Sequence, residues 1–168
     1  MSRALTLSPV AHNPDPTIPL TTIKGVTKTL DDWTTTFHLC LIVLPGRPEA
    51  SIHVPVAKRI LDVFSGADCR TAYLVSGNER SATRVLGAEA EEHLVFCDPE
   101  SVFIRSLGLT RLPAFVHLNV DTTLVAAAEG WNPKEWNAVA SGLATSMKWT
   151  KPAIPSAHDP APSEGWAA

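Results

Sequence analysis

The residues of this sequence with the most reactive side chains are three cysteines, Cys40, Cys69 and Cys97. Their number is odd and no short spacing joins them, so they do not form a disulfide framework. Cys97 directly precedes Asp98-Pro99, a predicted helix start, and a helix N-terminus stabilises a thiolate. The Asp98 carboxylate acts against this, because a negative charge raises the pKa of a thiol. Cys97 is the candidate for thiol chemistry, whereas Cys40 is expected in the core and Cys69 in a loop.

Other side chains give weaker signals. Six histidines show no short-spaced pair and no cysteine partner at zinc spacing, so we predict no metal site and no cofactor. Ser51 and His53 lie close together, but no Gly-x-Ser-x-Gly elbow surrounds them, so a hydrolytic pair is not expected. Arg47 near a helix N-terminus could hold an anion, although a solvated loop arginine is the simpler interpretation. Glu49 in the first helical turn is satisfied by the helix dipole.

Composition bounds the class of protein. The chain has 168 residues, of which 45% are hydrophobic and 18% charged, which suits one soluble globular domain. A net charge of −3 argues against nucleic acid as a partner. The longest apolar run, Leu39 to Leu44, is too short to span a membrane, so direct membrane insertion is not expected. The first residues make a poor signal peptide, and the cysteine usage suits a reducing compartment, so a cytoplasmic location is predicted.

The elements that must position these side chains alternate between strands and helices. His38 to Leu44 is a continuous apolar run typical of a buried central strand. Ser51 to Phe64 has an apolar helical face, and Pro55 within it predicts a kink or the true helix start. Thr71 to Val75 is the next predicted strand, followed by a helix over Glu79 to Leu86 that Ser76 or Asn78 caps and Gly87 ends.

The second half continues the pattern. Ala88 to Glu92 is predicted to be a polar connection and His93 to Phe96 an extended piece. We expect a helix with Pro99 in its first position, ended by Gly108. Ala114 to Val120 and Leu124 to Glu129 form a predicted hairpin. Asn132 then caps a last helix that packs on the sheet through Trp136, Val139, Ala140 and Leu143, with Glu135 reaching back as in a capping box.

The two ends differ in composition from the middle. Residues 1–16 are rich in proline and predicted to be a flexible arm. Residues 17–147 form the predicted domain. Residues 148–168 are rich in proline and alanine and predicted to be a flexible tail.

Two segments carry a resemblance to a known superfamily. Gly108 to Val116, "G-L-x-x-L-P-A-F-V", followed by a hairpin, a glycine and a last helix, resembles the second half of a thioredoxin fold. Thr17 to Trp33, with a turn at Lys24-Gly25, resembles the opening hairpin of the TlpA/ResA-like and AhpC/TSA-like (peroxiredoxin) branches. The resemblance implies an α/β thioredoxin-like fold with an N-terminal β-hairpin and a central mixed sheet of about four or five strands flanked by helices. It also implies that Pro113 is cis.

The same resemblance exposes a departure from the family pattern. In thiol oxidoreductases of this fold a Cys-x-x-Cys motif follows the first central strand, which here corresponds to Arg47 to Ala50. The loop from Pro45 to Pro55 contains no cysteine. The peroxiredoxin pattern fails at the same place.

The resemblance therefore implies a scaffold that retains the groove of the family but lacks its catalytic cysteines. The residues predicted to line this groove come from the loop after the first central strand and from the turn at Pro113. They are Arg47, Pro48, Glu49, Leu112, Pro113 and Phe115.

The leading hypothesis is a redox-inactive, thioredoxin-like domain that binds a protein or peptide. Trp149 and Trp166 in the tail are candidates for docking. The alternative is a thiol-disulfide oxidoreductase or peroxidase that uses Cys97 alone. A third possibility is a subunit of a larger complex that uses the proline-rich ends as clamps.

Overall fold

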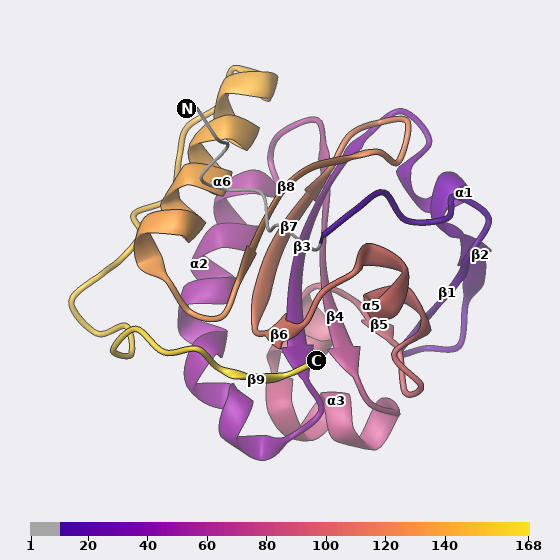
Figure 1. Cartoon of the computed structure of the whole chain (residues 1–168), viewed down its shortest axis with the longest axis horizontal. Coiled ribbons are helices and arrows are strands. Elements are labelled where there is room, and N and C mark those ends of the chain that lie inside the picture. Colours follow the sequence, from indigo (N-terminus) through magenta and orange to yellow (C-terminus); the bar gives the residue numbers. More distant parts are fainter. Residues whose placement is uncertain (1–10) are drawn as a thin grey trace.

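The computed structural model describes residues 11–168, which form a mixed sheet with helices on both faces (Figure 1). Seven strands make the main sheet, in the order β2-β1-β5-β4-β3-β7-β8. These strands are β1 (Pro19–Thr22), β2 (Thr27–Thr29), β3 (His38–Pro45), β4 (Cys69–Ser76), β5 (Leu94–Cys97), β7 (Ala114–Leu118) and β8 (Leu124–Glu129). Two short strands, β6 (Arg111–Leu112) and β9 (Trp166–Ala167), pair separately. The predicted α/β class with a central mixed sheet is confirmed.

The middle of the sheet is parallel. Strands β3, β4 and β5 run in the same direction, and Pro45 pairs with Ser76 while Val75 pairs with Cys97. The carboxyl ends of these three strands therefore lie at one edge. Every residue of β3 from Leu39 to Leu44 is fully buried, because helices cover both faces of this strand.

The sheet is wider than the four or five strands expected. The predicted N-terminal hairpin is present, and its first strand pairs with β5 through Thr21–Cys97 and Thr22–Phe96. The hairpin thus extends the main sheet instead of standing apart. Leu20 faces the core from this strand, and the Trp33 ring packs edge-on against Phe96 at 5.1 Å between centroids.

Helices form one layer on each face of the sheet. The α-helices are α1 (Leu30–Thr34), α2 (Val54–Phe64), α3 (Glu79–Leu86), α4 (Glu89–Glu92), α5 (Val102–Leu107) and α6 (Pro133–Met147), and η1 (Pro48–His53) is a 3-10 helix. Buried residues of α2, α3 and α6 share one core cluster, and those of α1 and α5 share the other. Figure 1 shows α2 and α6 side by side on the face of the sheet that carries the first of these two clusters.

Local signals predicted several helix ends correctly. Pro55 marks the true start of α2, since the residues before it form η1. Asn78 caps α3 by accepting from the Ser81 N–H at 2.9 Å, and Gly87 ends this helix. Asn132 caps α6 with Pro133 in its first turn, although Glu135 accepts from the Asn132 side-chain amide instead of the backbone.

Two local predictions were wrong. The connection Ala88 to Glu92 contains the single turn of α4, which tertiary contacts of Glu89 hold in place. Helix α5 begins at Val102 and not at Pro99. The Asp98 carboxylate accepts from the backbone N–H groups of Val102 and Ile104 at 2.9 and 3.0 Å, which shifts the start by one turn.

Both ends of the described chain lie against the domain. Residues 1–10 of the predicted arm lie outside the described residues. His12 donates its N–H to the Leu107 carbonyl at 2.9 Å, and the Asn13 side chain accepts from the Leu124 N–H at 2.8 Å. The segment 148–168, predicted to be flexible, runs back along α2 and α6 to the edge of the sheet (Figure 1). The domain boundaries stay a prediction.

Candidate functional site: a groove filled by the C-terminal strand

The loop that follows β3 forms one wall of the predicted groove. Gly46 approaches β4 so closely that a Cβ there would lie 2.6 Å from the Ser76 carbonyl oxygen. Arg47 and Glu49 then pair, with 3.2 Å between Nε and Oε2, and both are exposed together with Pro48. These three predicted residues lie together at the edge where the parallel strands end. They offer charges and an apolar ring but no nucleophile.

The turn at Pro113 forms the opposite wall. The Leu112–Pro113 peptide bond is cis, as the resemblance predicted. The Leu112 side chain is fully buried, so this residue presents its backbone to the groove. Phe115 is also fully buried, and its ring packs against Trp136 at 5.6 Å. The structure therefore places Phe115 in the core and not among the groove residues.

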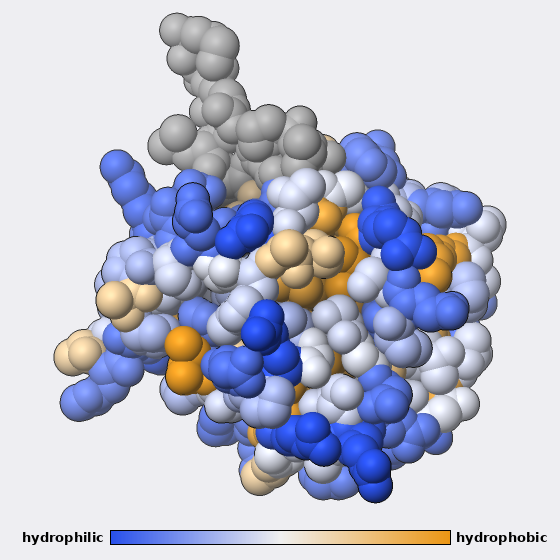
Figure 2. All heavy atoms as spheres, turned by 60° about the horizontal axis from the view of Figure 1, so that its bottom comes forward, coloured by the Kyte–Doolittle hydropathy of each residue, from blue (hydrophilic) through white to orange (hydrophobic). Residues whose placement is uncertain are grey.

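The groove between these walls holds the end of the chain itself. Strand β9 pairs antiparallel with β6, with Trp166 opposite Leu112 and Ala167 opposite Arg111. The Ala168 N–H continues the pairing to the Thr110 carbonyl at 2.9 Å. Figure 2 turns this end of the molecule toward the reader, and hydrophobic residues appear there as patches between hydrophilic ones. We call the surface of Arg47, His53, Arg111, Leu112, Pro113 and Trp131 that contacts residues 163–168 the strand groove.

Backbone contacts on both sides hold the strand. The Arg111 guanidinium donates to the carbonyls of Glu164 and Gly165 at 3.1 and 2.9 Å. On the other side, Trp131 and Ser163 exchange two backbone hydrogen bonds of 2.8 and 3.0 Å. These contacts recognise an extended main chain, because every group that they engage on the strand is a peptide N–H or carbonyl group.

The Trp166 side chain covers a buried histidine. Its ring lies 5.3 Å from the Arg47 guanidinium, at cation–π distance, and 5.8 Å from the His53 ring. The Trp131 ring also lies near His53, with 6.2 Å between the ring centroids. His53 is 1% exposed and neither ring nitrogen has a hydrogen-bond partner. Burial lowers the pKa of His53 to about 4, so the imidazole is neutral at pH 7.

An ion pair anchors the segment that leads to the strand. Arg59 on α2 binds both carboxylate oxygens of Asp159 at 3.1 and 2.6 Å and donates to the Ala153 carbonyl at 2.8 Å. Burial opposes ionisation of Asp159, but the Arg59 guanidinium and the Ser156 N–H outweigh it, and the pKa of the carboxyl is lowered. Trp149 adds a hydrogen bond of 2.7 Å from its indole N–H to the Val63 carbonyl.

The three thiols lie outside the strand groove. Cys40 and Cys69 are buried, and Cys69, predicted in a loop, is instead the first residue of β4. Burial together with the neighbouring Cys69 thiol raises the pKa of Cys40. Cys97 is half-buried at the carboxyl end of β5, at the same sheet edge as the loop after β3. Burial and then the charge of Glu79 raise the pKa of Cys97 to about 11. This environment disfavours a reactive thiolate.

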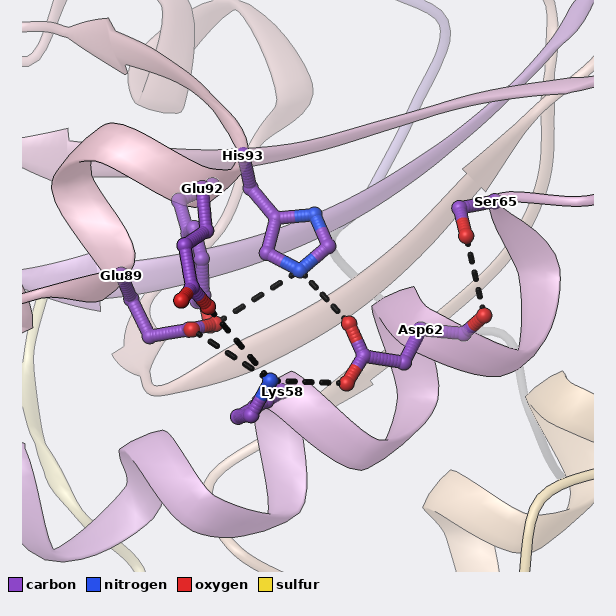
Figure 3. Close-up of polar contacts among 7 residues, drawn as sticks. Lys58, Asp62, Ser65, Glu89, Glu92 and His93 are labelled. Carbon is purple, nitrogen blue, oxygen red and sulfur yellow. Dashed lines mark hydrogen bonds and ion pairs between the residues drawn. The ribbon is translucent and has the colours of Figure 1, made fainter.

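A second polar cluster links α2 to α4 (Figure 3). The Lys58 ammonium lies 2.9 Å from Asp62, 3.6 Å from Glu89 and 3.5 Å from Glu92. His93 lies between Asp62 and Glu89, at 2.8 and 3.6 Å. The Tyr73 hydroxyl also donates to the buried Glu89 at 2.7 Å. Since the lysine occupies the space among the carboxylates, the cluster fastens α4 to α2.

No group of three histidine, cysteine or acidic side chains that could hold a metal ion occurs within residues 11–168. A histidine pair does occur, with His38 Nδ1 2.9 Å from His117 Nε2 at the start of β3. Nor is any helix in this part of the chain long and apolar enough to cross a membrane. The cytoplasmic location stays a prediction.

Sequence reasoning found half of the residues of the strand groove. It predicted Arg47, Leu112 and Pro113 as groove residues and Trp166 as a docking candidate. It assigned no role to His53, Arg111, Trp131 or Gly165. Gly165 carried the best available signal, because glycine next to an aromatic residue at the end of an otherwise proline-rich tail is compatible with a tight backbone approach.

Comparison with solved structures shows a thioredoxin-like fold. Bacterioferritin comigratory protein from Xanthomonas campestris, whose alkyl peroxide reduction activity was analysed structurally, superimposes with a TM-score of 0.65 at 15% identity, over 82% of this chain and 98% of that one. A putative thiol:disulfide interchange protein DsbE from Chlorobium tepidum gives 0.65 at 16% identity, over 84% and 99%. A PrxQ mutant from Xylella fastidiosa gives 0.64 at 13% identity, over 87% and 99%.

These neighbours match the two branches that the sequence resembles. No family model matches the sequence, and neither does any curated protein. The activities of the neighbours agree better with the thiol-chemistry alternative than with a redox-inactive module. At this level of identity the likeness shows the fold alone.

Proposed function

We propose that this chain is a polypeptide-binding, thioredoxin-like module that uses the strand groove and performs no thiol chemistry there. The observation that carries the proposal is the pairing of β6 with an extended segment beside Pro113. An exposed strand edge that adds a further strand gains affinity from main-chain hydrogen bonds and specificity from side-chain pockets. The guanidinium of Arg111 adds two donors for the carbonyls of any extended ligand.

The test is selection of a displayed random nonapeptide library on the full chain and on its Gly165→Ala variant, whose own strand cannot occupy the groove. We expect enriched peptides that bind at least about tenfold more weakly when Arg111→Ala is introduced. Arg80→Ala, which removes an exposed arginine on α3, is the matched control and should leave binding unchanged. Absence of enrichment on both proteins, or binding that is indifferent to Arg111→Ala, would refute the proposal.

The second candidate is thiol redox chemistry by Cys97. Two observations favour it: the solved neighbours include a peroxide-reducing protein, and Cys97 lies at the sheet edge that also carries the strand groove. The raised pKa of Cys97 argues against it. Thiol alkylation as a function of pH separates the two candidates.

A further inference from the structure

The strand groove selects glycine at one position by contact with backbone. Gly165 has φ +73°, and a Cβ on it would lie 2.0 Å from the Leu112 carbonyl oxygen and 3.0 Å from Pro113 Cδ. The Leu112 carbonyl belongs to the wall strand β6, so it cannot move aside as a flexible side chain would. Any residue with a Cβ at this position is therefore excluded from the bound conformation.

The next position selects an aromatic ring. Trp166 fills the space between Arg47 and His53, with the guanidinium at 5.3 Å and the imidazole at 5.8 Å. A smaller side chain would leave this space open and expose the His53 ring. The groove thus has two adjacent subsites, one that only glycine fits and one that a large aromatic ring closes.

The chain's own strand leaves polar atoms of the groove without hydrogen-bond partners. Both His53 nitrogens are buried without a partner beneath Trp166. A buried polar group without a hydrogen bond destabilises the state that buries it. The paired strand is also short, with two residues in β9. Any aromatic occupant would bury His53 in the same way, so it is the short pairing that favours exchange of the strand for another segment.

We propose that residues 163–168 are a resident ligand of the strand groove, and that the partner is a polypeptide carrying a glycine followed by a tryptophan or similar aromatic residue in an extended segment. The partner segment takes the place of Gly165 and Trp166 and pairs with β6. Until it does so, the chain's own strand keeps the groove closed. This inference rests on the proposed function and adds the identity of the bound segment and the competition with the chain's own end.

The probe is a fluorescent heptapeptide with the sequence of residues 162–168, PSEGWAA. We expect it to bind the full-length Gly165→Ala variant at least about tenfold more tightly than the unaltered chain, because the variant releases its own strand. The matched control is Gly25→Ala: Gly25 also has a positive φ, +87°, but a Cβ there meets nothing within 4 Å. Gly25→Ala should bind the peptide as weakly as the unaltered chain.

Two further measurements keep the test decisive. Trp166→Ala opens the groove without a backbone clash, so it should also bind the peptide more tightly than the unaltered chain. Peptides with alanine in place of the glycine or of the tryptophan should lose at least about tenfold in affinity for Gly165→Ala. Circular dichroism of each variant checks that the domain remains folded.

The outcomes separate this inference from the proposed function. Equal binding of the heptapeptide to all proteins, or equal binding of the alanine-substituted peptides, overturns the glycine–aromatic assignment. If the heptapeptide does not bind while library peptides bind in an Arg111-dependent manner, the inference is wrong and the proposed function stands. If neither the heptapeptide nor any library peptide binds, both fail.

Discussion

Cys97 is the residue on which an enzymatic function would depend, and its surroundings keep the thiol protonated. With a pKa of about 11, only about one thiol in ten thousand is ionised at pH 7. The thiolate is the nucleophile in thiol–disulfide exchange and in peroxide reduction. The position of Cys97 near the predicted helix start does not offset this raised pKa, because helix α5 begins only at Val102.

Alkylation of Cys97 tests this directly. We expect the rate of iodoacetamide labelling at this residue, followed by mass spectrometry, to remain low up to pH 9 and to rise toward pH 11. Glu79→Gln should shift the rise to lower pH, since it removes a neighbouring negative charge. Cys97→Ser provides the background. Fast labelling with a midpoint below about 8.5 would instead favour the redox candidate.

His53 makes stability depend on pH in a predictable direction. Its pKa is about 4 in the folded protein and about 6.5 in an unfolded chain. Between these values the unfolded state binds more protons, so the stabilisation is complete above pH 6.5 and is lost as the pH falls toward 4. His117, whose pKa burial and His38 also lower to about 4, contributes in the same direction.

The substitution His53→Phe should remove the first of these contributions. We expect the loss of unfolding free energy between pH 7 and pH 5 to shrink by at most about 2 kcal/mol. A residual dependence should remain from His117. Urea unfolding at the two pH values measures the effect, and an unchanged pH dependence in the variant would mean that His53 is hydrated and not covered by Trp166.

At the scale of elements, one ion pair between distant residues anchors the middle of the segment 148–168. The Asp159 side chain is 3% exposed and Arg59 28%. Removing one partner of a buried pair leaves the other charge without compensation, and partial exposure of Arg59 reduces this cost.

Asp159→Asn should therefore lower the free energy of unfolding by about 1–3 kcal/mol. It should also increase amide exchange in residues 153–163. Asp68→Asn, at an exposed aspartate before β4, is the matched control. A variant as stable as the control, with unchanged exchange, would show that the ion pair does not hold the segment.

The elements also show which features a sequence can reveal. The bounds of α3, the start of α2 at Pro55 and the hairpin β7–β8 follow from caps, breakers and alternation within a few residues. Helix α4 does not, because its single turn relies on the contact between Glu89 and Tyr73. The docking of residues 148–168 relies on partners about a hundred positions away, such as Arg59. The amino-acid composition of the segment does not reveal such contacts.

For the whole molecule, the resemblance predicted the fold and the two walls of the groove but not its contents. The central mixed sheet, the N-terminal hairpin and the cis bond at Pro113 follow from segments that match a family pattern. The occupant of the groove departs from that pattern. It comes from a segment that the resemblance did not cover, and so only the three-dimensional arrangement reveals it.

The groove beside Pro113 binds an extended strand, here the chain's own. Residue-resolved amide exchange of the full chain measures this at the N–H groups of Trp131, Ser163 and Ala168, which bond across the groove. We expect all three to exchange at least about tenfold more slowly than in an unstructured peptide. Gly165→Ala, but not Gly25→Ala, should abolish the protection at Ser163 and Ala168. Exchange at unstructured rates at Ser163 and Ala168 in the unaltered chain would show that the strand does not occupy the groove.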